Sequence, residues 1–172
     1  GTIDPWLGPG VLVWPDQCLD FTKCRRRTCQ DWGEHGVRGG DVTEPDGPRL
    51  RQGAFDGISE MGTPPRLGGT YVCTEGPRFE TPAEIRMFRT LGGDLVGMTG
   101  VPEVVLAREA GMCYMTICIV TNYAAGISGQ NLTEGEVSQI MRHTASQVRQ
   151  AILSVVEKLG ASWDCRCASA RD

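Results

Sequence analysis

Histidine is scarce in this chain, which has His35 and His143 among its 172 residues. Neither belongs to a recognisable Ser-His-Asp set, and no glycine-rich loop with a following lysine is present to hold nucleotide phosphates. We interpret His143 as a solvated side chain on the polar side of a long helix. The sequence therefore gives no support for a serine hydrolase or a P-loop nucleotide-binding protein.

Positive charge and long apolar runs are also lacking. The formal net charge is -4, and the single basic run, Arg25-Arg26-Arg27, is interpreted as a solvated loop. Because phosphate backbones select basic surfaces, we expect no nucleic-acid partner. No stretch approaches the roughly 18 apolar residues of a membrane span, and no signal-peptide pattern is present. We therefore expect a cytoplasmic protein without a membrane partner.

The eight cysteines give weak support for a metal site. Four of them lie in or beside apolar or strand-like runs and are interpreted as buried thiols: Cys18, Cys73, Cys113 and Cys118. Cys165 and Cys167 are closer together than zinc ligands usually are, and Cys24 and Cys29 lie in a loop without matching histidines. We favour inert thiols and expect no metal, while a redox or disulfide role for Cys165 and Cys167 stays open.

The two halves of the chain differ in regularity. Residues 1–67 are rich in glycine and proline, which predicts long loops around one or two short strands, the first near Val11–Trp14, and one weakly supported helix near Pro48–Ile58. The length fits one domain with a sizeable core.

The second half alternates strand and helix patterns. The predicted strands are residues 70–73, 94–98 and 112–121, and the predicted helices are residues 82–91, residues 102–110 and a long helix that follows a second capping box at Thr133 and Glu136 and ends at Gly160. The apolar run 112–121 predicts a central strand buried on both faces. This alternation predicts an α/β fold with a mixed sheet flanked by helices.

Glu80 lies directly before a helix start. Thr81 and Glu84 form a capping box around Pro82, so the cap does not require Glu80. Beside Phe79, this additional carboxylate is placed to accept hydrogen bonds from a ligand. The alternative is that Glu80 only favours the positive end of the helix dipole.

Asn122 follows the predicted strand 112–121. Open α/β sheets bind ligands outside the carboxyl ends of their strands. Its amide can donate to O6 of a 6-oxopurine and accept the proton at N7. The alternative is a turn-forming asparagine before Ala124, Ala125 and Gly126.

Met98 and Thr99 end the strand before the helix that starts near Pro102. A hydroxyl group and backbone amides at a helix N-terminus are typical of an anion site, such as a phosphate site. Met98 alone is more typical of a core residue. We expect the three segments that carry Glu80, Thr99 and Asn122 to converge at one edge of the sheet.

Two longer motifs carry a resemblance. They are Glu-Gly-Pro-Arg-Phe-Glu-Thr-Pro-Ala-Glu at residues 75–84 and Gly-Met-Thr-Gly-Val-Pro-Glu-Val-Val-Leu-Ala-Arg-Glu at residues 97–109. With them, the chain resembles the trimeric purine nucleoside phosphorylase and methylthioadenosine phosphorylase family over nearly its whole length. The resemblance implies a homotrimer that splits a purine nucleoside with inorganic phosphate as co-substrate and without a cofactor.

The resemblance also implies roles for individual residues. Tyr71 and Met98 would line the ribose, Phe79 would pack on the base, Glu80 would accept from N1, Thr99 would contact phosphate, and Asn122 would bind O6 and N7 with Tyr123 and Ala124 beside it. Asn122 and Glu80 are the predicted catalytic residues, and the bond of Asn122 at N7 would strengthen as negative charge builds on the leaving base.

Three positions bear on the substrate. Family members that take 6-aminopurines resemble a pattern with aspartates in place of Asn122 and Ala124 and a serine in place of Glu80. We therefore expect inosine, guanosine or methylthioinosine as substrate, with methylthioadenosine as the second choice. Glu134 stands where many inosine and guanosine enzymes have a histidine, and it either accepts from a 5' hydroxyl or favours the helix dipole.

The family's first third, with its glycine loop and its Arg-His phosphate pair, has no counterpart here. We therefore expect residues 1–172 to be the carboxyl-terminal part of a single nucleoside phosphorylase-like domain, incomplete at its amino end. A non-catalytic remnant that retains a purine pocket stays open as an alternative.

Overall fold

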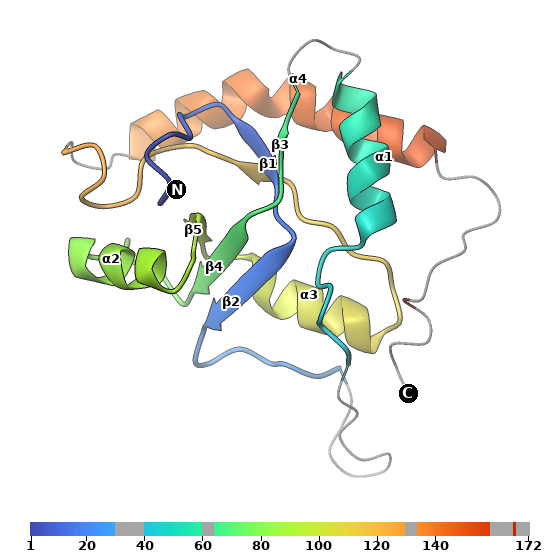
Figure 1. Cartoon of the computed structure of the whole chain (residues 1–172), viewed down its shortest axis with the longest axis horizontal. Helices are drawn as coiled ribbons and strands as arrows, with labels where there is room; N and C mark the ends of the chain where they lie inside the picture. The colour runs from blue at the N-terminus through green and yellow to red at the C-terminus, as the bar shows by residue number, and fades with distance from the viewer. Residues whose placement is uncertain (30–39, 60–63, 130–133, 159–166, 168–172) are drawn as a thin grey trace.

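A computed structural model of the protein describes residues 1–29, 40–59, 64–129, 134–158 and 167. These residues form ten helices and strands. The strands are β1 (Leu12–Trp14), β2 (Gln17–Phe21), β3 (Arg66–Leu67), β4 (Thr70–Thr74), β5 (Leu95–Gly97) and β6 (Cys118–Ile119), and the helices are α1 (Pro48–Ser59), α2 (Pro82–Thr90), α3 (Gly100–Glu109) and α4 (Glu134–Lys158). Strands lie at the centre and helices outside (Figure 1). The predicted mixed sheet flanked by helices is confirmed.

The strands form two three-stranded sheets, and the chain passes from one sheet to the other between β1 and β2 and again between β3 and β4. β2, β4 and β5 are parallel with the order β2-β4-β5, whereas β1 pairs in parallel with β3 and antiparallel with β6. Pro15 and Asp16 lead β1 directly into β2, and Gly68 and Gly69 lead β3 into β4. Backbone bonds continue across this bend, from Gly68 N to the Trp14 carbonyl oxygen over 2.9 Å.

The two faces of the parallel sheet pack against different helices. Val72 packs with Ile85 and Phe88 of α2, whereas Tyr71 packs with Val104 of α3 on the opposite face. Alternation of side chains along β4 produces this division. A third cluster joins β1 to α1 and α4, which cross each other along one side of the molecule (Figure 1). These contacts hold the carboxyl ends of β4 and β5 in place.

The prediction of a central strand at residues 112–121 is wrong. β6 is limited to Cys118–Ile119, lies at the edge of its sheet, and is half-buried. The preceding residues bond to a loop instead: the Tyr114 carbonyl oxygen accepts from Gly47 N over 2.8 Å, and Thr116 N donates to Asp46. The apolar run therefore packs as an irregular segment rather than as part of a ladder.

The predicted helices are largely confirmed. α2 begins with the predicted cap, and α1 forms despite its weak sequence pattern. α3 is assigned from Gly100, yet Val101 is non-helical, so regular helix starts at Pro102 as expected. Thr133, half of the second predicted capping box, lies outside the described residues. No helix within the described ranges is long and apolar enough to cross a membrane.

Candidate functional site

A cavity of about 560 Å³ lies where β5, the segment after β6, the loop before α2 and the first turn of α4 meet. Its lining residues are Gly1, Phe79, Glu80, Val96, Gly97, Met98, Thr99, Thr121, Asn122, Ala124, Val137 and Ser138. This volume falls within the range of sites for small ligands. Apolar side chains with a few polar groups among them are typical of such sites.

Six of the predicted site residues meet in this cavity: Phe79, Glu80, Met98, Thr99, Asn122 and Ala124. Ala124 is buried, Phe79 is 43% exposed at the rim, and the carboxylate and amide come from segments far apart in the sequence. The structure thus brings together the three segments that were expected to converge. The ligand contacts assigned to these residues stay predictions.

The helix cap leaves Glu80 available, as expected. Thr81 Oγ1 accepts from Glu84 N over 3.2 Å, and Glu84 Oε2 accepts from Thr81 N over 2.7 Å. Arg78 also donates to Glu84, and these bonds lower the pKa of that carboxyl to about 2. Glu80 instead accepts from the Thr74 hydroxyl group over 2.6 Å. Glu80 lines the cavity, and its carboxylate has lone pairs left for a ligand.

Asn122 lines the cavity, and two local bonds fix its amide group. Its Nδ2 donates to the Tyr123 carbonyl oxygen over 2.9 Å, and its Oδ1 accepts from the Thr121 hydroxyl group over 2.6 Å. An amide has two donor hydrogens and two acceptor lone pairs, so each atom retains capacity for one more bond. The two local bonds hold the amide plane in one orientation.

The route by which Asn122 reaches the cavity differs from the prediction. Thr2 pairs antiparallel with Leu95 and parallel with Tyr123, so the segment 122–124 runs antiparallel to β5. Asn122 is therefore not at the carboxyl end of a parallel strand. It enters the cavity because β6 runs antiparallel to β1 and delivers the chain from the opposite direction.

The backbone of Thr99 is hydrogen-bonded to the side chain of Tyr71. Thr99 N donates to the Tyr71 hydroxyl oxygen over 3.2 Å, and the Thr99 side chain is exposed and makes no capping bond to α3. Burial raises the pKa of the Tyr71 hydroxyl above its ordinary value. A Cβ at Gly97 would lie 2.3 Å from that hydroxyl oxygen, so glycine is required there. The buried hydroxyl group of Tyr71 thus fixes the position of the Thr99 backbone through this hydrogen bond.

Three predicted residues are not among those that line the cavity. Tyr71 is buried beneath it, and Tyr123 lies beside Gly8. Glu134 is the first residue of α4, and its side chain lies outside the described part. In its place, Val137 and Ser138 reach the cavity from the first turn of α4. Neither residue was among the predicted site residues.

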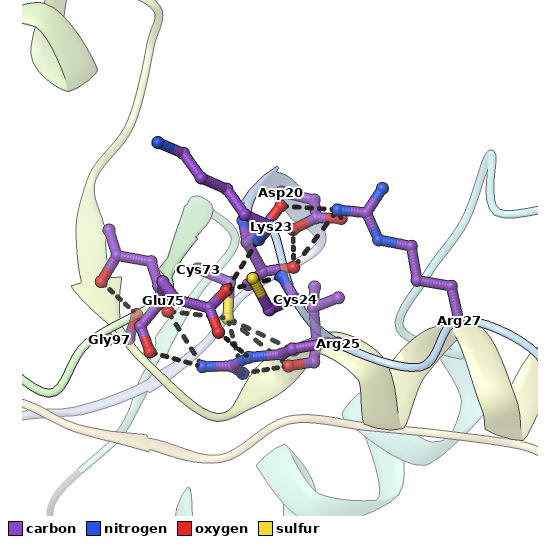
Figure 2. A network of polar contacts seen from close by, with 11 residues as sticks. Asp20, Lys23, Cys24, Arg25, Arg27, Cys73, Glu75 and Gly97 are labelled. Carbon is purple, nitrogen blue, oxygen red and sulfur yellow. Dashed lines mark hydrogen bonds and ion pairs between the residues drawn. The ribbon is translucent and has the colours of Figure 1, made fainter.

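The prediction of a solvated loop is wrong for Arg25. Its guanidinium group points toward Cys73 and Glu75, and the side chain is 18% exposed (Figure 2). It donates to the carbonyl oxygens of Thr74 and Glu75 over 3.1 and 3.0 Å, and to that of Val101. Arg27 follows the prediction better, since it is half-exposed and pairs with Asp20 over 3.0 Å.

None of the described cysteines forms a disulfide bond. Cys73 is buried as predicted, whereas Cys18, Cys113 and Cys118 are only half-buried, and Cys24 and Cys29 are exposed. Burial raises the pKa of Cys118 to about 12. Cys165 lies outside the described residues. Among the side chains that the structure describes, no three His, Cys, Asp or Glu residues gather closely enough to hold a metal ion.

Comparison with protein families gives a match over residues 1–157 to the model of the phosphorylase superfamily. The chain is 48% identical over 170 residues to a probable 6-oxopurine nucleoside phosphorylase of Moorella thermoacetica, covering 99% of this chain and 65% of that protein. It is also 48% identical over 170 residues to a probable S-methyl-5'-thioinosine phosphorylase of Methanothermobacter thermautotrophicus, covering 99% and 58%. The chain thus spans less than two thirds of these relatives' length.

Solved structures give the same grouping. The chain superposes on methylthioadenosine phosphorylase from Schistosoma mansoni in complex with adenine with a TM-score of 0.89 and 29% identity, covering 99% of this chain and 67% of that one. A methylthioadenosine phosphorylase from an antarctic soil metagenomic library gives a TM-score of 0.87, 28% identity, and coverage of 99% and 61%.

Proposed function

The chain belongs to the phosphorylase superfamily, and on that premise we propose that it acts in the phosphorolysis of a 6-oxopurine nucleoside. In this reaction an oxygen of inorganic phosphate attacks C1' of the sugar, the bond to N9 breaks, and the free base and the sugar 1-phosphate are formed. The observation that carries the proposal is the presence of the Glu80 carboxylate and the Asn122 amide in one cavity. Relatives named 6-oxopurine nucleoside phosphorylase support it.

The pair selects the base by hydrogen-bond polarity. A 6-oxopurine has a donor at N1 and an acceptor at O6, which Glu80 and Asn122 complement. N1 of adenine carries no proton. Its lone pair would face a lone pair of the Glu80 carboxylate, and no hydrogen bond could form between them. Leaving buried polar groups unpaired is costly, so this arrangement rejects the 6-amino base.

Catalysis in this proposal depends on position and electrostatics. As the bond to N9 breaks, positive charge develops on the sugar and negative charge on the base. The acceptor oxygen of Asn122 stabilises the proton at N7 of the leaving base. Thr99, whose hydroxyl group makes no capping bond, contacts the attacking phosphate. Inorganic phosphate is the co-substrate, and no cofactor is required.

The 5' end of the sugar would meet the first turn of α4. Val137 offers an apolar contact and Ser138 a hydroxyl group, and Glu134 precedes them by one turn. This mixture is compatible with a 5' hydroxyl or a methylthio group, and the relatives carry names of both kinds. We therefore propose inosine, guanosine or methylthioinosine as the substrate.

Methylthioadenosine is the second candidate. The two solved structures described above are methylthioadenosine phosphorylases, one of them in complex with adenine. The fold alone therefore accommodates a 6-aminopurine in other members. Asn122, Ala124 and Glu80 favour the 6-oxopurine in this chain. On the resemblance, we also propose a cytoplasmic homotrimer.

The test is phosphate-dependent release of hypoxanthine from inosine and methylthioinosine, with adenosine and methylthioadenosine as matched substrates. The proposal predicts release that requires phosphate and favours the 6-oxopurine nucleosides. Faster release of adenine would favour the second candidate. Hypoxanthine binding without release would favour the non-catalytic alternative, and neither binding nor release would contradict the proposal.

A further inference from the structure

Thr74, the last residue of β4, connects Glu80 to the strand beneath it. Its hydroxyl group lies 2.6 Å from Glu80 Oε1 and 3.3 Å from the Gly97 carbonyl oxygen. A hydroxyl group has one proton, and the shorter, charge-assisted contact to the carboxylate takes it. This bond fixes the direction of one carboxylate oxygen. The orientation of Glu80 therefore depends on the position of Thr74.

Arg25 holds the backbone on both sides of this contact. One terminal nitrogen of its guanidinium group donates to the carbonyl oxygens of Thr74 and Glu75, and the other donates to that of Val101. Figure 2 shows this group among the polar atoms at the carboxyl end of β4. Thr74 and Glu75 lead toward Glu80, while Val101 follows Thr99 by two residues. The side chain thus joins the two backbone segments that carry the carboxylate and the hydroxyl group of the cavity.

Arg25 acts mainly through hydrogen bonds to backbone carbonyl oxygens rather than through an ion pair, and we call this set of bonds the Arg25 clamp. Its Nε lies 3.9 Å from Glu75 Oε1, beyond hydrogen-bond distance. The other oxygen of Glu75 accepts from Lys23 N over 2.7 Å. The short contacts of the guanidinium group all go to backbone carbonyl oxygens at the end of β4 and the start of α3.

We propose that Arg25 is a positioning residue for purine recognition, an inference that rests on the proposed function. By fastening the end of β4 to the start of α3, it fixes Thr74, and through Thr74 it fixes Glu80. A planar guanidinium group can bond to several carbonyl oxygens at once in fixed directions, whereas the ammonium group of lysine is a point charge on a flexible stem. Arg25→Lys therefore removes the clamp and keeps the charge.

Calorimetric titration of the full chain with hypoxanthine tests this proposal. We expect Arg25→Lys to weaken hypoxanthine binding about three- to tenfold, the effect of a hydrogen bond that is mispositioned rather than deleted. Arg27→Lys, the same change two residues away in a side chain that pairs with Asp20, is the matched control and should bind as the unchanged chain does. Urea unfolding of each variant measures any effect on stability separately.

A double substitution distinguishes positioning from a general structural effect. If Arg25 acts through Glu80, then Arg25→Lys in a Glu80→Gln background should weaken binding less than twofold further. An equal loss in both backgrounds, or unchanged binding by Arg25→Lys, would overturn the proposal. Thr74→Val removes the hydroxyl group but leaves Arg25 and its acceptors in place. We expect this variant to bind hypoxanthine about as weakly as Arg25→Lys does. Unchanged binding by Thr74→Val would overturn the proposal. Failure of the unchanged chain to bind hypoxanthine would instead contradict the proposed function.

Discussion

At the scale of single residues, the account depends on the hydrogen-bond polarity of Asn122. Thr121 and Tyr123 hold its amide in one orientation, which leaves one donor hydrogen and one acceptor lone pair for a ligand. An ionised aspartate at this position would have acceptors only. It could pair with a 6-amino group but would repel the O6 of a 6-oxopurine.

We therefore expect Asn122→Asp to weaken hypoxanthine binding about tenfold or more and to strengthen adenine binding, because the exchange leaves O6 facing a carboxylate. Competitive titration with the two bases measures the change. Gln150→Glu, on an exposed position of α4, introduces the same change from amide to acid at a distance and serves as the control. An unchanged ratio of the two affinities would contradict the role given to Asn122.

At the scale of elements, the start of α2 is the most sharply defined local structure. Replacing Thr81 with alanine should lower the free energy of unfolding by about 1 kcal/mol, the usual cost of losing such a cap. Urea unfolding measures this loss. Thr90→Ala, at the exposed end of the same helix, provides the comparison, and an equal loss there would argue against a specific cap.

The cap also predicts a pH dependence. The bonds from Arg78 and Thr81 lower the pKa of Glu84 from 4.5 to about 2, so its ionised form is favoured in the folded state. The stabilisation is therefore present above about pH 4.5 and lost as the pH falls toward 2. Glu84→Gln should lower stability at pH 7 and have little effect near pH 2. Urea unfolding across this range checks the sign, and a larger effect at low pH would contradict it.

Local signals explain which elements the sequence predicted. The cap of α2 is encoded within four consecutive residues, so both its position and the availability of Glu80 could be inferred. The segment 112–121 was mispredicted because its backbone bonds to Asp46 and Gly47, far away in the chain. For the same reason Arg25 was read as solvated: its acceptors lie about 50 or more residues further on.

At the scale of the whole molecule, Asp46 ties the loop before α1 to the segment before β6. Burial raises its pKa from 3.8 to about 6, although the bond from Thr116 N opposes the rise. The folded state therefore binds this proton more tightly than the unfolded state does. Stability contributed by the protonated form is lost as the pH rises from about 4 through 6.

Asp46→Asn should remove this loss, because the amide oxygen can still accept from Thr116 N without a buried charge. We expect the variant to be more stable than the unchanged chain at pH 7 by up to about 3 kcal/mol and similar to it near pH 4. Urea unfolding at the two pH values measures the difference. Asp56→Asn on the exposed side of α1 is the control. An Asp46→Asn variant that is no more stable than the unchanged chain at pH 7 would contradict this sign.

The site as a whole required the tertiary structure. Glu80 and Thr99 could be predicted from single segments, because each directly precedes a helix start that the sequence marks. Asn122 was predicted from the end of a strand at residues 112–121 that the structure limits to Cys118–Ile119. The contribution of Val137 and Ser138 depends on how α4 lies across the sheet, which no local pattern encodes. The burial of Tyr71 beneath the cavity depends likewise on which face of β4 packs against α3.

The central claim is that this cavity reads a 6-oxopurine through Glu80 and Asn122. Its most direct test is calorimetric titration of the chain with hypoxanthine and with adenine, repeated with Glu80→Ala and Asn122→Ala. The account predicts that hypoxanthine binds more tightly than adenine and that each substitution abolishes the difference. Equal or tighter binding of adenine, or hypoxanthine binding that survives both substitutions, would contradict it.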